Sequence, residues 1–199
     1  MAFTFFFRDQ QTLDLMAEYA VPALKQNRYI RIWDAGCAMG PEPYTIAIIL
    51  RENMGKFLFR NVRLTASDID ESNFGDIITQ AVYPEEQLKR IPAEIFQRYF
   101  EPDDRPDHFR LCAEIRAAVQ FQRHDLLSLQ PIRTDFGLIV CKNVLLHFTQ
   151  EQRIEVIRMF HAALVDGGFF LTEQTQKLPP ECEPLFRPVT SAAQIFQKI

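Results

Sequence analysis

A loop with two glycines, between a predicted strand and a predicted helix, constrains the fold of this chain more than any other feature. A run of strand-forming residues over 29–35 stops at Gly36, a second glycine follows at Gly40, and a helical pattern covers residues 44–54. Glycine lets the backbone turn with a positive φ and lets a ligand approach it closely. The free N–H groups at the start of the helix favour an anionic or electron-rich ligand. We therefore expect a strand, a tight loop and a helix that together bind a ligand.

The spacing of the two glycines narrows the class of ligand. The loop reads Gly-x-x-x-Gly, so it lacks the Gly-x-Gly-x-x-Gly of dinucleotide-binding loops and the Gly-Lys-Ser/Thr of P-loops. An NAD-dependent oxidoreductase is therefore disfavoured. Asp68 follows the strand predicted over residues 62–67, and a carboxylate at this place holds a ribose diol in nucleotide-binding βαβ folds. Asp70 is better spaced to cap the helix expected over residues 71–80, which leaves Asp68 for the ribose. The loop and Asp68 together indicate a nucleoside-containing cofactor.

Strand-like and helix-like segments alternate along the chain, which predicts one α/β domain over residues 1–199. Residues 166–168 read as a turn. Repeated strand–helix units imply a doubly wound, mostly parallel sheet with right-handed crossovers. The further strands are expected over residues 119–123, 136–141, 169–172 and 188–199, and the further helices over residues 9–24 and 151–164.

Residues 81–118 break this rhythm and are predicted to form a small inserted α/β subdomain. The stretch contains four prolines and two short helical pieces, over residues 85–89 and 93–99. The alternating residues 108–115 follow a Pro-Asp turn signal, which is typical of a small antiparallel hairpin.

Composition limits the partners and the compartment. The chain has 22 basic and 26 acidic residues and a net charge of −4, so its bulk charge gives no case for nucleic acid. The four cysteines form no Cys-x-x-Cys pair, which predicts reduced thiols in a cytoplasmic protein and no metal site. No apolar run reaches the roughly 18 residues of a membrane span, so we expect no transmembrane segment.

Four blocks of the sequence, in order, resemble the catalytic domain of CheR-type protein-glutamate O-methyltransferases. Residues 4–9 are similar to the family's Thr-x-Phe-Phe-Arg block, and residues 32–44 to its Trp-x-Ala-x-x-x-x-Gly-Glu-Glu-Pro-Tyr loop. Residues 66–70 match its Ala-Ser-Asp-Ile-Asp, and residues 141–148 resemble its Cys-Arg-Asn-Val-x-Ile-Tyr-Phe. The chain departs from the family at Pro41, Lys142 and His147, and has Ala2 where a polar cofactor contact is expected. It begins almost at the first block, so the resemblance implies a catalytic domain without the usual N-terminal helical domain.

The resemblance implies a Rossmann-like class I methyltransferase fold and S-adenosylmethionine as the cofactor, with S-adenosylhomocysteine as its product. It implies methylation of a protein glutamate, with a chemotaxis receptor as the expected partner. Arg8 would orient the acceptor carboxylate, and His147 stands where a tyrosine would line the methyl-transfer site. Phe6 and Phe7 are core residues or walls of the pocket. The implied cofactor-binding residues are Thr4, Arg8, Ala35, Gly36, Glu42, Asp68, Asp125, Leu126, Asn143 and Val144.

Several of these residues also have a purely structural interpretation. Glu42 can stabilise the start of a helix, since an acidic side chain there pairs favourably with the helix dipole, and Arg8 can be a solvated arginine at a helix start. Asp125 can be a turn residue, Asn143 a helix cap, and His147 a packed histidine. Two other functions stay open, namely a methyltransferase for another acceptor and a non-catalytic module that binds S-adenosylmethionine.

Overall fold

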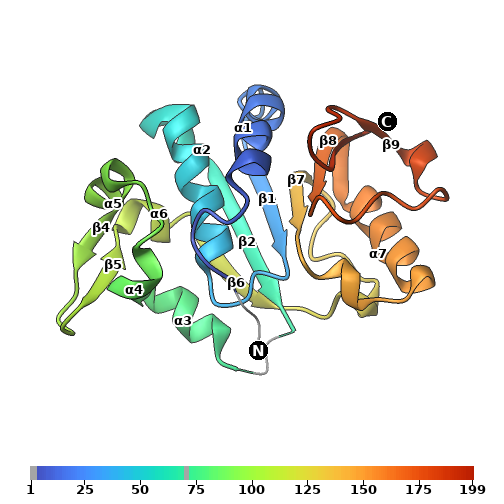
Figure 1. Cartoon of the computed structure of the whole chain (residues 1–199). Coiled ribbons are helices and arrows are strands. Elements are labelled where there is room, and N and C mark those ends of the chain that lie inside the picture. The colour runs from blue at the N-terminus through green and yellow to red at the C-terminus, as the bar shows by residue number, and fades with distance from the viewer. Residues whose placement is uncertain (1–3, 70–71) are drawn as a thin grey trace.

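The protein is described by a computed structural model over residues 4–69 and 72–199 (Figure 1). Its centre is a seven-stranded sheet in the order β6-β2-β1-β7-β8-β10-β9. The first five strands of this order are parallel, and β10 pairs antiparallel with both β8 and β9. This confirms the predicted mostly parallel sheet. The strands are β1 (Ile30–Ala35), β2 (Val62–Asp68), β6 (Val119–Arg123), β7 (Phe136–Cys141), β8 (Leu164–Thr172), β9 (Phe186–Pro188) and β10 (Ile195–Lys198).

Helices cover both faces of the sheet, and side-chain alternation along β1 shows how. Ile32 belongs to the core formed with α1 and α2, whereas its neighbour Trp33 belongs to the core formed with α7. Successive side chains of a strand point to opposite faces, so the central strands are buried on both sides. All six residues of β7 are buried, as its continuous apolar run predicts. The helices are α1 (Gln10–Leu24), α2 (Pro41–Phe59), α3 (Phe74–Gln80) and α7 (Gln150–Ala163), and the 3-10 helices are η1 (Leu126–Ser128), η2 (Leu145–His147) and η3 (Glu183–Leu185).

A second, smaller sheet lies between α3 and β6 in the chain. It has three antiparallel strands in the order β3-β5-β4, with bounds Val82–Pro84, His108–Leu111 and Phe100–Pro102. In Figure 1 it appears in green at one side of the molecule, beyond α2. Its presence fits the insertion expected over residues 81–118, whose status as a subdomain remains a proposal. The accompanying helices are α4 (Glu85–Leu88), α5 (Ala93–Tyr99) and α6 (Ala113–Arg116).

The structure corrects several predicted boundaries. Residues 166–168 form no simple turn, because β8 already begins at Leu164 and runs through them with a shift of register against β7. The C-terminal segment contains two antiparallel strands instead of one. The strand expected to reach residue 115 ends at Leu111, because α6 follows it. The helix expected from residue 71 begins at Phe74 with Asn73 as its N-cap, and Asp70 and Ala2 lie outside the described residues.

No helix within the described ranges is both long and apolar enough to span a bilayer.

Candidate active site

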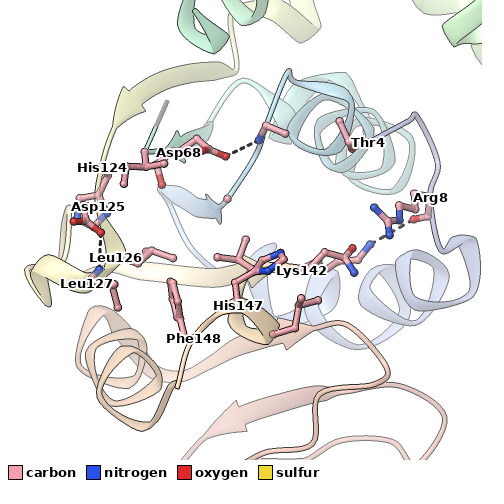
Figure 2. Close-up of a pocket in the computed structure, with 17 residues that line it drawn as sticks. Thr4, Arg8, Asp68, His124, Asp125, Leu126, Leu127, Lys142, His147 and Phe148 are labelled. Carbon is pink, nitrogen blue, oxygen red and sulfur yellow. Dashed lines mark hydrogen bonds between the residues drawn. The ribbon is translucent and has the colours of Figure 1, made fainter. Parts of the chain in front are cut away.

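A cavity of about 560 Å³ opens where the parallel strands β1, β2, β6 and β7 end. Ligands bind at this edge in open α/β sheets. Its lining combines apolar residues with about as many polar and charged ones, which can fix the orientation of a ligand. Figure 2 shows the residues that line it, namely Thr4, Arg8, Gly36, Ala38, Ser67, Asp68, Ile69, His124, Asp125, Leu126, Leu127, Lys142, Asn143, Val144, Leu146, His147 and Phe148.

The glycine loop forms one wall of the cavity, where the backbone of Gly36 is exposed to the cavity without a side chain. Gly36 has a φ of 101°, and its N–H donates to the carbonyl oxygen of Ser67 at 2.7 Å. A Cβ added at Gly36 would lie 2.1 Å from Cγ2 of Val144. Backbone conformation and lack of space therefore both require glycine here. The loop approaches Val144, another predicted cofactor residue, without any intervening side chain.

Asp68 lies at the end of β2, beside the glycine loop. Its Oδ2 accepts a hydrogen bond from the backbone N–H of Ala38 at 2.9 Å, so the carboxylate also fixes the shape of the loop (Figure 2). The side chain is half-buried and lines the cavity. A carboxylate in this position has acceptor capacity for the hydroxyl groups of a ribose.

Replacing Asp68 with alanine is expected to weaken binding of S-adenosylhomocysteine by roughly tenfold to a hundredfold, because charged hydrogen bonds contribute about 1.5–3 kcal/mol. Isothermal titration calorimetry measures the change. Asp76→Ala is a matched control, since Asp76 is an exposed aspartate of α3 that does not line the cavity. Equal affinities for the two variants would contradict the ribose assignment.

A neighbouring part of the wall is formed by residues that follow β6. The Oδ1 of Asp125 accepts a hydrogen bond from the N–H of Leu127 at 2.9 Å, so this aspartate caps η1, as its structural interpretation anticipates. Leu126 is buried and presents apolar surface to the cavity. The predicted contact of both residues with adenine is compatible with this arrangement and stays a prediction.

The segment after β7 contributes the predicted residues Asn143, Val144 and His147. Asn143 has a left-handed backbone with a φ of 59°, and its N–H donates to Oε2 of Glu173 at 2.9 Å. It caps no helix, because Val144 is the N-cap of η2. His147 is exposed and lines the cavity, which places its imidazole where an acceptor could enter.

Arg8 and Thr4 reach the cavity from the N-terminal segment. Arg8 lies over the ring of Phe5, with 5.9 Å from its Cζ to the ring centroid. Phe6 and Phe7 do not line this cavity, and the structure supports the alternative that they are core residues. Phe6 is fully buried and packs edge-on against Tyr83 and Phe100.

Two predicted residues lie behind the cavity wall. Ala35 is fully buried at the end of β1. Glu42 is in the first turn of α2, with its side chain 12% exposed, and its Oε2 lies 3.3 Å from Nζ of Lys142. Lys142 itself does line the cavity. Their roles as direct cofactor contacts remain predictions.

The sequence patterns do not single out a buried aspartate next to these residues. Asp34 is fully buried, and its two carboxyl oxygens have no hydrogen-bond partner among the described residues. Burial, and next the Glu42 carboxylate, raise the pKa of Asp34 well above its usual range. An aspartate between two apolar residues of a buried strand is the signal that could reveal it. Lys142 was noted only as a departure from the family pattern, although its side chain is 2% exposed.

Residues 2–195 match the family described as "CheR methyltransferase, SAM binding domain". The chain belongs to the CheR methyltransferase family. This membership confirms the resemblance found in the sequence and S-adenosylmethionine as the cofactor of the domain.

Curated relatives and a solved structure agree with this assignment. "Chemotaxis protein methyltransferase 2" of Pseudomonas aeruginosa is 34% identical over 176 residues, covering 87% of this chain and 62% of the relative. A chemotaxis protein methyltransferase of Borreliella burgdorferi is 29% identical over 184 residues, covering 88% and 64%. This CheR chain thus spans a little under two thirds of the length of these relatives. The N-methyltransferase NodS of Bradyrhizobium japonicum, solved with S-adenosyl-L-homocysteine, shares the fold, with a TM-score of 0.55, 14% identity and coverage of 96% and 87%.

The described residues of this CheR domain fit the cofactor. The Gly36 cradle, which a single Cβ would fill, leaves backbone open to a close-lying ligand, and Asp68 offers a carboxylate beside it. Arg8 supplies a charged group on the side away from Asp125 (Figure 2), and Asn143 and His147 add further polar groups to the lining.

Proposed function

We propose that this protein is an S-adenosylmethionine-dependent protein-glutamate O-methyltransferase and that a chemotaxis receptor is its partner. The observation that carries the proposal is the presence of Arg8 on the same cavity as the glycine loop and Asp68. A guanidinium is a planar, permanently charged donor that matches the geometry of a carboxylate. The printed names of the relatives support a chemotaxis methyltransferase as the class of enzyme.

The residues of the cavity divide into a cofactor half and an acceptor half. Asp68 and the Gly36 loop hold the nucleoside, while Arg8 orients the glutamate and His147 borders its entrance. When bound, S-adenosylmethionine supplies an electrophilic methyl group on a sulfonium sulfur, which leaves as a neutral thioether. The acceptor carboxylate is ionised at neutral pH, so the protein needs no general base. Its contribution is alignment of the carboxylate oxygen with the methyl carbon.

We expect binding of S-adenosylmethionine and S-adenosylhomocysteine in the micromolar range and no binding of NAD. The glycine spacing and Asp68 give the reason, because they provide a ribose site without a dinucleotide loop. Calorimetric titration of the folded protein with all three compounds is the measurement. If neither S-adenosylmethionine nor S-adenosylhomocysteine binds, the proposal is contradicted.

The acceptor is identified by a second assay. Purified protein is incubated with methyl-labelled S-adenosylmethionine and with either glutamate-containing receptor peptides or a mixture of small metabolites. A base-labile methyl ester on a peptide supports the proposed reaction. Label on metabolites would indicate another acceptor, and binding without any transfer would indicate a non-catalytic module.

The four cysteines form no disulfide, and the cytoplasm stays the predicted compartment.

A further inference from the structure

Lys142 connects two parts of the active site through its buried ammonium group. It follows β7, and its side chain is 2% exposed. Its Nζ lies 3.3 Å from Oε2 of Glu42 and donates to the carbonyl oxygen of Arg8 at 3.4 Å (Figure 2). These contacts join the first turn of α2 to the N-terminal segment, although Arg8 and Lys142 are 134 residues apart.

The backbone around Arg8 needs such anchors. Phe7 and Asp9 have φ angles of 56° and 63°, in the left-handed region that residues other than glycine seldom adopt. The N–H of Phe7 donates to Oγ1 of Thr45 at 3.1 Å, and Lys142 holds the next carbonyl oxygen along the chain. The turn that carries Arg8 is thus attached to α2 by Thr45 and to the end of β7 by Lys142.

The carboxylate of Glu42 keeps the ammonium of Lys142 in place, because it pairs with the ammonium directly. The charge of Lys142 also lowers the pKa of the buried Asp34, but burial and the Glu42 carboxylate outweigh this effect and raise that pKa. A buried lysine is favourable only where opposite charge and acceptors surround it. With Glu42 and the Arg8 carbonyl oxygen as partners, the ammonium already has two acceptors from the protein itself.

We propose that Lys142 is a positioning residue for methyl transfer, which holds the Arg8 backbone so that the guanidinium faces the acceptor carboxylate. The proposal rests on the proposed function, in which Arg8 orients that carboxylate. Lys142 acts through Arg8 and not on the acceptor, because its own ammonium is engaged by Arg8 and Glu42.

The first test compares Lys142→Met with Lys142→Arg, using the most active glutamate peptide at saturating S-adenosylmethionine. Methionine keeps the length of the side chain but donates no hydrogen bond, so kcat is expected to fall by about thirtyfold to a hundredfold, the range caused by a misplaced reacting group. Arginine keeps the charge and the donors and should restore most of the turnover. Equal turnover of the methionine variant and the wild type would overturn the proposal.

A matched control separates positioning from a general loss of stability. Lys198 also donates to a carbonyl oxygen, that of Leu164 at 2.8 Å, and its Nζ lies 3.5 Å from Asp166 Oδ1. Lys198→Met removes a comparable pair of contacts and should leave kcat unchanged. A similar loss of kcat in both variants would show that Lys142 has only a structural role.

A double-mutant cycle with Arg8→Lys tests whether Lys142 acts through Arg8. Residues that act as a unit give non-additive effects. The double variant is therefore expected to be no slower than the slower single variant. If the losses of kcat in the two single variants multiply in the double variant, Lys142 acts independently of Arg8, and the proposal is overturned.

Hydrogen exchange tests the role of Lys142 without measuring turnover, so its result does not depend on the proposed function. Loss of the Lys142 contact should speed hydrogen exchange at the Phe7 amide, whereas Lys198→Met should not. If the wild type methylates no glutamate, the proposed function fails, but this exchange still decides whether Lys142 holds the turn. Unchanged exchange would overturn the inference. If Lys142→Met does not fold, the same comparisons are made in an Asp34→Asn background, which removes one of the buried carboxyl groups.

Discussion

Replacing Gly36 with alanine is expected to weaken binding of S-adenosylhomocysteine by about thirtyfold or more. A positive φ costs a residue with a Cβ about 1–2 kcal/mol. The new methyl group would also lie 2.1 Å from Cγ2 of Val144, and overpacking of this kind costs about 1–3 kcal/mol. The loop or Val144 must shift, and both line the cavity. Calorimetric titration measures the loss, with thermal unfolding as the measure of stability.

Gly55→Ala is the matched control for this substitution. Gly55 has a φ of 76°, so alanine there meets a similar backbone penalty, but nothing lies within 4 Å of the added Cβ. Gly55 lies at the kink of α2, away from the residues of the cavity. We expect it to lower stability and leave cofactor affinity unchanged. The double variant Gly36→Ala/Val144→Ala should regain part of the affinity; no recovery would contradict the assigned clash.

Arg8→Lys is expected to reduce turnover by about a hundredfold while the fold and most of the cofactor affinity are kept. Lysine retains the positive charge but loses the planar fork that fixes a carboxylate in one orientation. A nucleophile displaced by about 1 Å can cost about a hundredfold in rate. The measurement is kcat with the best glutamate peptide at saturating S-adenosylmethionine, with thermal melting as the folding control.

Arg90→Lys provides the comparison for the arginine substitution. Arg90 stacks over the ring of Phe5, which Arg8 also contacts, at 4.1 Å from the ring centroid, but it is exposed and does not line the cavity. It should leave kcat near that of the wild type. Near-normal turnover of Arg8→Lys would mean that Arg8 supplies charge alone or belongs to the surface.

The sequence determined the central elements because their patterns are local. The strands β6 and β7 have the bounds that their composition predicts, and Asp68, Gly36 and Arg8 line one cavity as expected. Parallel strands end at a common edge, so residues that follow them are brought together by any doubly wound fold. The glycines after Asp166 predict a turn, and this prediction is wrong because a local pattern contains no information on strand pairing. In the structure, β8 resumes its pairing with β7 beyond the bulge, with Phe169 opposite Leu138.

Only the tertiary structure decided which polar groups lose contact with water and which distant segments meet. The Phe-Phe-Arg block predicts aromatic contacts, but not that Phe6 enters the core while Arg8 remains at the cavity. The burial of Asp34 and its raised pKa arise from β1 lying in the middle of the sheet. The bond from Lys142 to Arg8 spans nearly the whole chain. Periodicity and motif spacing describe neighbours along the chain, whereas desolvation and long-range pairing depend on the three-dimensional packing of elements that those patterns do not connect.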